Sequence, residues 1–77
     1  MSDATRTLDA LGLLCPLPVL KARKVLKSMA PGEVLALLAD DPAAVVDVPH
    51  FCHEAGHVLE GQRDETEHQV YLIRRGG

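Results

Sequence analysis

The chain has 77 residues, of which 47% are hydrophobic and 25% are charged, and its formal net charge at pH 7 is -3. A chain this short buries only about 60% of the surface of its unfolded state, so residues 1–77 are expected to form one small domain without a deep substrate pocket. The acidic balance and the lack of a long apolar run disfavour stable nucleic-acid binding, a secretion signal and a membrane span, and they predict a cytoplasmic protein.

The first predicted elements are a strand, a helix and a second strand. Leu8 and Ala10 alternate with polar neighbours, a pattern typical of a half-buried strand. A helix is expected over residues 16–29, because a proline is tolerated in the first turn of a helix. The apolar run at 34–39 then predicts a buried strand. Residues 1–4, before these elements, are expected to be a flexible tail.

A second helix is expected to follow the sequence Asp-Asp-Pro. Asp41 is the candidate N-cap and Pro42 the first helical residue. Pro49 lies inside this segment, and because a proline removes a backbone hydrogen bond we expect a kink or a restart there, with Asp47 capping the second piece. Gly56 suits the position that follows the helix, where a left-handed backbone is common.

Two final strands, at residues 57–64 and 68–75, are expected to form a hairpin, with residues 76–77 as a flexible tail. The predicted order is therefore βαβαββ. The simplest architecture for this order is a two-layer α/β (α+β) sandwich, in which a four-stranded mixed sheet carries both helices on one face. The first two strands are expected to be parallel, because a helical crossover joins them.

The most informative stretch is Cys-Pro-Leu-Pro, directly before the first helix. The unpaired N–H groups and the dipole of a helix N-terminus stabilise an anion. The sequence therefore predicts a lowered pKa for Cys15 and a reactive thiolate, with Pro16 and Pro18 fixing the turn. A small buried filler is the alternative interpretation of Cys15. Two cysteines are too few for the disulfide framework of a secreted domain, so both are expected to be free thiols.

The first helix is expected to place one face in the core and to leave an unusual face outside. That outer face combines leucines with basic residues: Leu17, Leu20, Lys21, Arg23, Lys24 and Lys27. Leucines among cations, one turn from a reactive thiol, are typical of a protein-binding surface. We refer to these six residues as the docking face and expect them to contact partners. Singly exposed leucines are also common on monomers, which is the alternative.

A second group of chemistry-bearing residues lies near the end of the second predicted helix. His50, Cys52, His53 and His57 have spacings that suit zinc or copper. Gly56 is expected to end the helix before the last of these histidines, which breaks the helical spacing. A buried free cysteine is also common. We therefore expect no metal site.

Three further features have ordinary explanations. Cys15 and Cys52 lack the C-x-x-C spacing of redox pairs. The closing Arg-Arg-Gly-Gly resembles the end of ubiquitin-like sulfur carriers, which use a terminal thiocarboxylate, but the predicted element order differs and a solvated tail is expected. Asp40 and Asp41 are expected to cap a helix rather than form an acid–base pair.

The segment LDALGLLCPLPVLKARK resembles the TusA/SirA family of small sulfur-carrier proteins, and most closely its TusA branch. The resemblance continues through PGEVLALLADDPAAVVDVPHFC and GHVL to YLIRRGG, and so covers about residues 7–77. It implies the same two-layer sandwich and implies that Cys15 carries sulfane sulfur as a persulfide. Leu17 departs from the family, in which an acidic residue is common between the two prolines, and this departure bears on the choice of partner.

The resemblance also implies partners. A cysteine desulfurase that uses pyridoxal phosphate would donate the sulfur, and relay proteins would accept it, most familiarly for 2-thiouridine in tRNA. Molybdenum-cofactor synthesis and sulfur oxidation are alternative destinations. The carrier itself, a sulfurtransferase without a turnover pocket, would need no metal or organic cofactor and would act as a monomer. The competing hypothesis is a regulatory module that docks through the first helix and in which Cys15 is incidental.

Overall fold

The computed structural model describes residues 4–77 and contains six elements. They are β1 (Arg6–Asp9), α1 (Leu17–Lys27), β2 (Val34–Ala39), α2 (Ala44–Ala55), β3 (Val58–Asp64) and β4 (Gln69–Arg74). The order βαβαββ confirms the prediction. Of the tail expected at residues 1–4, the first three residues lie outside the described part. None of the helices between residues 4 and 77 is long and apolar enough to cross a membrane.

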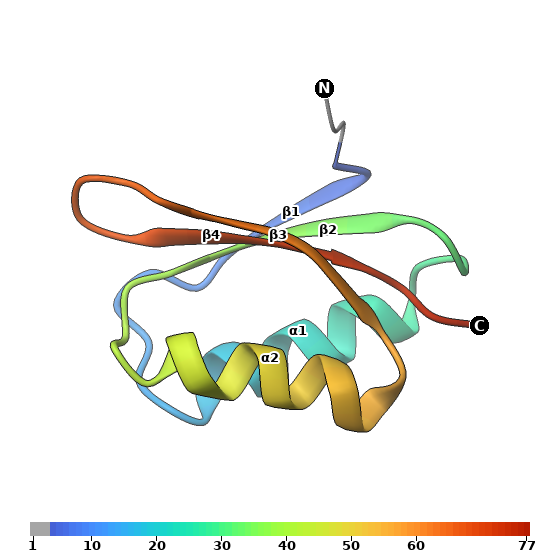
Figure 1. Cartoon of the computed structure of the whole chain (residues 1–77), viewed down its shortest axis with the longest axis horizontal. Coiled ribbons are helices and arrows are strands. Elements are labelled where there is room, and N and C mark those ends of the chain that lie inside the picture. Colours follow the sequence, from blue (N-terminus) through green and yellow to red (C-terminus); the bar gives the residue numbers. More distant parts are fainter. Residues whose placement is uncertain (1–3) are drawn as a thin grey trace.

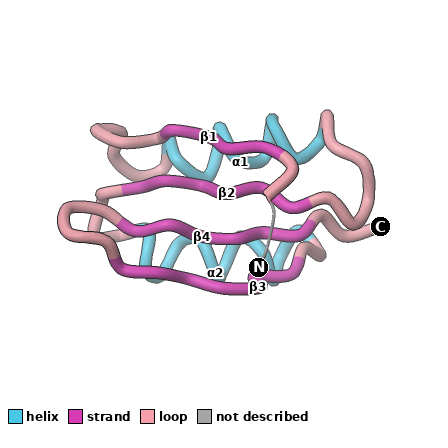
Figure 2. The backbone as a smooth tube through the Cα atoms, turned by 90° about the horizontal axis from the view of Figure 1, so that it is seen from above, coloured by secondary structure: helices cyan, strands magenta, loops and turns pink. Residues whose placement is uncertain are grey.

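The four strands form one mixed sheet in the order β1-β2-β4-β3. β1 pairs with β2 in parallel, whereas β4 is antiparallel to both β2 and β3. Both helices cover the same face of this sheet, α1 behind β1 and β2 and α2 behind β4 and β3 (Figures 1 and 2). The predicted two-layer sandwich, with a parallel first pair, is therefore confirmed.

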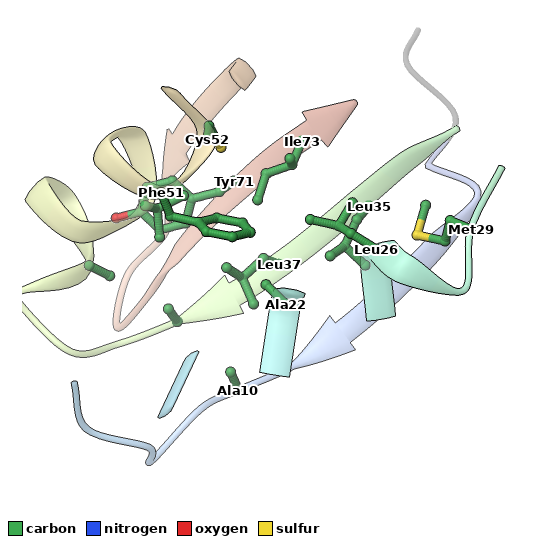
Figure 3. Packing of buried hydrophobic residues seen from close by; sticks show 13 residues of the cluster. Ala10, Ala22, Leu26, Met29, Leu35, Leu37, Phe51, Cys52, Tyr71 and Ile73 are labelled. Carbon is green, nitrogen blue, oxygen red and sulfur yellow. The ribbon is translucent and has the colours of Figure 1, made fainter. Parts of the chain in front are cut away.

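The core lies between the sheet and the helices. Leu35 and Leu37 alternate on β2 and are fully buried, in register with Ile73 and Tyr71 on the neighbouring β4. Burying one such aliphatic side chain stabilises the fold by about 1.5–3 kcal/mol. The helices and the ends of their loops add further side chains to this cluster (Figure 3): Ala22, Leu26, Met29, Phe51 and Cys52.

Helix α1 is amphipathic and follows the predicted pattern. Pro18, Ala22 and Leu26 are spaced four residues apart and are all buried, so one stripe of the helix faces the sheet. The helix begins at Leu17 and ends at Lys27, slightly inside the predicted range. The packing of this stripe fixes the rotation of α1, which leaves the rest of its circumference to solvent.

Helix α2 differs from the prediction at two points. It begins at Ala44 rather than at Pro42, and the Asp41 carboxylate accepts a hydrogen bond from the Ala43 N–H, so Asp41 caps the turn before the helix. The helix also runs through Pro49 as a single element, so the expected second piece is wrong. The bond that Pro49 removes would end on the carbonyl of Val45, which is an exposed residue of the helix.

The end of α2 agrees with the prediction. Gly56 has a φ of 79°, the left-handed conformation that glycine adopts at low cost. The N–H of His57 donates to the Cys52 carbonyl over 2.8 Å, and the N–H of Gly56 donates to the His53 carbonyl. These two bonds form a Schellman motif, which turns the chain from α2 into β3.

Candidate functional site

Cys15 lies in the segment that joins β1 to α1, at the N-terminal end of the helix. Its side chain is exposed and its thiol is free. The peptide bond between Cys15 and Pro16 is cis. Pro16 directly precedes the first residue of the helix, and Pro18 is buried in the first turn against the core. The sulfur therefore lies at the surface, while the first turn of the helix behind it packs against the core.

Two aspartates after β2 hold the backbone of this segment. The N–H of Cys15 donates to Asp41 Oδ2 over 2.5 Å, and the other Asp41 oxygen accepts from Ala43. The N–H of Gly12 donates to both carboxylate oxygens of Asp40, over 3.0 and 3.1 Å. Both carboxylates are thus occupied by backbone N–H groups of the neighbouring loops. Asp40 and Asp41 therefore have a structural role, because they join the segment that carries Cys15 to the turn before α2.

The pKa of Cys15 is raised, not lowered as the sequence predicted. The main cause is a hydrogen bond between the thiol and the carboxylate of Asp47, a half-buried residue in the first turn of α2. Desolvation and the negative charges of Asp47 and Asp41 act in the same direction. The expectation considered only the N-terminus of α1, whereas the fold also brings two carboxylates of the β2–α2 region to the sulfur.

An open groove of about 420 Å³ extends from Cys15 between the two helices. We refer to it as the sulfur groove. It is lined by residues of α1, of α2 and of the segment before α1: Cys15, Pro16, Val19, Arg23, Asp47, His50, Phe51 and Glu54. The guanidinium carbon of Arg23 lies 5.5 Å from the centre of the Phe51 ring, a cation–π contact that joins the two walls. The sulfur is therefore accessible both from solvent and along a charged groove.

Comparison with known proteins decides the family. The profile of the family described as sulfurtransferase TusA matches residues 6–75. The chain belongs to the TusA family. The crystal structure of a SirA-like protein from Desulfitobacterium hafniense is also similar, with a TM-score of 0.81 and 27% sequence identity over 95% of this chain and 100% of that chain. Both findings confirm the resemblance to the TusA/SirA family and identify the chain, at the level of the family, as a sulfur carrier of the sulfurtransferase type.

The docking face of this TusA-family chain is solvent-exposed, although its members do not all lie together. Leu17 and Leu20 are exposed, as are the three lysines of the set. Arg23, by contrast, turns toward Phe51 and lines the sulfur groove. All six residues are therefore exposed, but Arg23 also belongs to the sulfur groove, whereas the two leucines and three lysines do not line it.

The structure exposes further apolar residues that the docking face did not include, next to Cys15 in the sequence and at the start of α2. Leu14, next to the cysteine, is 68% exposed, and Val46, at the start of α2, is 71% exposed. Val45 is also exposed. The apolar run Leu13–Leu14 was a visible signal for the first of these. For the two valines the sequence analysis found no such signal.

The histidines near the end of α2 are not gathered into a metal site. Cys52 is 2% exposed, and burial raises the pKa of its thiol to about 11. His57 lies beyond the helix, and its Nδ1 accepts a hydrogen bond from the N–H of Gly76 over 3.0 Å. Among residues 4–77, no three potential ligands from His, Cys, Asp and Glu are grouped as a metal would need. Cys52 therefore has the environment of a core residue.

Proposed function

We propose that Cys15 carries sulfane sulfur as a persulfide between a cysteine desulfurase and relay proteins, on the route to 2-thiouridine in tRNA. The observation that supports this role is an exposed free thiol on an anchored backbone at the mouth of a groove. The other thiol, Cys52, is buried and has a raised pKa. Membership of the TusA family supports the coarser assignment of the chain as a sulfur carrier.

The transfer is a thiol exchange in which the protein gains and loses one sulfur atom. The Cys15 thiolate attacks the terminal sulfur of the donor's persulfide, and a new sulfur–sulfur bond forms at Cys15. The old sulfur–sulfur bond of the donor breaks, and its electron pair leaves on the donor cysteine, which takes up a proton. An acceptor thiolate then repeats this attack on the Cys15 persulfide. The rate depends on the thiolate fraction of the attacking cysteine and on access to the sulfur.

This chemistry makes modest demands on the carrier. The sulfur stays covalently bound throughout, so the proposed carrier uses no metal or organic cofactor, and the pyridoxal phosphate resides in the donor. The open sulfur groove suits a protein whose sulfur must enter two different partner sites in turn. We place this exchange in the cytoplasm and assign it to the monomer, because the Cys15 surface must be free for each partner.

Intact-mass spectrometry tests the carrier role. The protein is incubated with a cysteine desulfurase, cysteine and pyridoxal phosphate, and its mass is measured before and after reduction. We expect one added sulfur atom that reductant removes, none on Cys15→Ser, and normal loading of Cys52→Ala as the matched control. Loading that survives in Cys15→Ser would refute the assignment.

The tRNA destination requires a separate measurement. In cells that lack this gene, the 2-thiouridine content of tRNA is compared after complementation with the wild-type protein or with Cys15→Ser. We expect restoration only by the wild type. A normal 2-thiouridine content in the uncomplemented cells would indicate that the protein passes its sulfur to another pathway, such as molybdenum-cofactor synthesis or sulfur oxidation.

A docking module is the second candidate, and the exposed leucines of α1 favour it. Leu17 and Leu20 are solvent-exposed beside lysines, as a binding surface requires. If no sulfur is added while the donor is active and the Cys15 thiol is free, partner capture becomes the decisive experiment. Pull-downs with Leu17→Ser, Leu20→Ser and Lys24→Glu would then locate the contact.

A further inference from the structure

Asp41 and Asp47 both lie beside Cys15, and the structure gives them different tasks. Asp41 uses one oxygen on the N–H of Cys15 and the other on the N–H of Ala43, so its carboxylate is committed to the backbone. Asp47 lies in the first turn of α2, half-buried. Within residues 4–77, neither salt bridge of the structure involves it. Asp47 is therefore a carboxylate at the sulfur without a cationic partner.

The geometry joins Asp47 to the sulfur rather than to the backbone. Asp47 and Cys15 line the sulfur groove together, and they also line a narrower hollow beside it. From this shared position the Asp47 carboxylate favours the protonated sulfur, and it is the main cause of the raised pKa of Cys15. A thiol that gives its hydrogen to a carboxylate is a poor nucleophile, because the thiolate is the attacking species.

The other charged groups around the groove do not replace this contact. Arg23 is held over the Phe51 ring from the α1 side. His50 and Glu54 line the same groove from α2. Of all these groups, only Asp47 and Asp41 act on the protonation of Cys15, and both favour the thiol. Within residues 4–77, the arginine that lines the groove thus contacts Phe51, and no cation is among the groups that act on the protonation of Cys15.

We propose that Asp47 gates Cys15: its carboxylate holds the thiol hydrogen in the unloaded carrier, and a cationic side chain of the partner, paired with Asp47, releases the sulfur for attack. This inference rests on the proposed function, since it concerns the same sulfur. When the cation pairs with Asp47, the thiol proton passes to water. The resulting thiolate then attacks the terminal sulfur of the donor persulfide, and the donor cysteine leaves with the electron pair and is protonated.

The gate determines the chemistry of the partner. A donor or acceptor that presents a lysine or arginine beside its own cysteine is attracted to Asp47, whereas one that presents a carboxylate is repelled. Because the unloaded carrier stays a thiol until such a partner docks, it reacts slowly with stray oxidants and alkylating agents. Asp47 would therefore couple reactivity to recognition without a conformational change.

The first test measures the alkylation of unloaded protein by iodoacetamide as a function of pH, with intact mass as the readout. We expect Asp47→Asn to shift the pH profile of Cys15 alkylation to lower pH and to speed the reaction at neutral pH. Glu54→Gln is the matched control, since it removes the same charge from the same helix and groove, and its profile should coincide with that of the wild type. An unchanged profile in Asp47→Asn would overturn the gate.

The second test asks whether the site favours cations. Wild type and variants are treated with two methanethiosulfonates, one bearing a trimethylammonium group and one a sulfonate. The ratio of the cationic to the anionic rate should fall roughly thirtyfold in Asp47→Asn, because one unit charge about 4 Å away in water changes each rate about five- to sixfold, and it changes them in opposite directions. The ratio in Glu54→Gln should stay near the wild-type value. Equal ratios in wild type and Asp47→Asn would exclude selection of a cationic partner.

Two controls keep these outcomes distinct from other failures. If Asp47→Asn does not fold, as judged by circular dichroism, Asp47→Ser is a second neutral replacement with the same expected results. Neither alkylation nor thiosulfonate labelling needs a sulfur donor, so the gate can fail while sulfur loading of the wild type succeeds. Conversely, a wild-type protein that never loads sulfur would refute the carrier role, even if alkylation and thiosulfonate labelling both show the effect expected of Asp47.

Discussion

The backbone N–H of Cys15 donates a hydrogen bond to Asp41 Oδ2 over 2.5 Å, across 26 residues of sequence. This bond joins the segment that carries the thiol to the turn before α2. The same carboxylate accepts from Ala43, so one side chain fixes both the cysteine and the start of the second helix. The position of the sulfur relative to α2, and therefore to Asp47, depends on this junction.

Replacing Asp41 should damage both stability and sulfur loading. Asp41→Ala leaves the N–H groups of Cys15 and Ala43 without their acceptor, and we expect the free energy of unfolding to fall by about 1–3 kcal/mol. Loading of Cys15 by a desulfurase should also slow, because the sulfur is no longer held in place. Urea denaturation and timed intact-mass measurements check the two effects. Asp40→Ala, which removes a more exposed contact with Gly12, should cost less; equal effects would contradict a special role of Asp41.

Truncation of two leucines of α1 should affect different properties, stability for Leu26 and partner binding for Leu20. Leu26 is fully buried in the core, so Leu26→Ala should lower the free energy of unfolding by about 2–5 kcal/mol. Leu20 is exposed on the docking face, and Leu20→Ala should change stability by no more than about 0.5 kcal/mol. Urea denaturation measures both. We expect Leu20→Ala to weaken desulfurase binding instead, and unchanged affinity would remove this residue from the docking face.

Stability should fall when the pH drops below the ordinary pKa of histidine, because of His57. Burial, with the charges of Arg75 and Arg23, lowers the pKa of His57 from its ordinary value of 6.5. The unfolded chain therefore binds this proton at a higher pH than the folded protein does. The resulting contribution to stability is complete above pH 6.5, is lost as the pH falls toward the folded pKa, and does not change further below it.

Urea denaturation at intervals between pH 7.5 and pH 5 measures this loss. In His57→Gln the acid side of the stability profile should be flatter than in the wild type. His53→Gln is the matched control, because His53 is an exposed residue of the same region. A wild-type profile that does not differ from that of His57→Gln would show that His57 does not cause the pH dependence.

The fold was predictable because its elements have strong local patterns. The apolar run at 34–39 became β2 with the same bounds, and Gly56 ended α2 in the left-handed conformation expected of it. Pro49 was misleading, since a proline disfavours a helix interior on average, whereas here the bond that it removes would end at an exposed residue, Val45. Packing of the residues around it kept α2 in one piece.

The site was predictable only in part, for a different reason. Cys15 could be identified from its position before two prolines and a helix. Its electrostatic environment depends on Asp41 and Asp47, which belong to another part of the chain and reach the sulfur only through the packing of α2 against α1. No local periodicity encodes such a contact. The helix N-terminus alone therefore predicted the wrong direction for the pKa of the thiol.

The last prediction concerns Gly76 and Gly77, whose replacement should affect stability but not sulfur transfer. A Cβ on Gly76 would overlap the carbonyl of Gly56, and the N–H of Gly76 donates to His57, so this glycine packs at the end of α2. Gly76→Ala should displace the tail and cost about 0.5–1.5 kcal/mol, the contribution of one hydrogen bond. Gly77→Ala has open space around its Cβ and should be neutral.

Sulfur loading should be unchanged in both glycine variants, because Gly56 lies at the end of α2 opposite to the turn that contacts Cys15. Thermal denaturation and desulfurase-dependent mass gain measure the two properties on the same samples. If Gly76→Ala abolished loading while the fold was retained, the terminal glycines would take part in sulfur transfer. That outcome would revive carriage of sulfur at the C-terminus, which we otherwise assign to Cys15 alone.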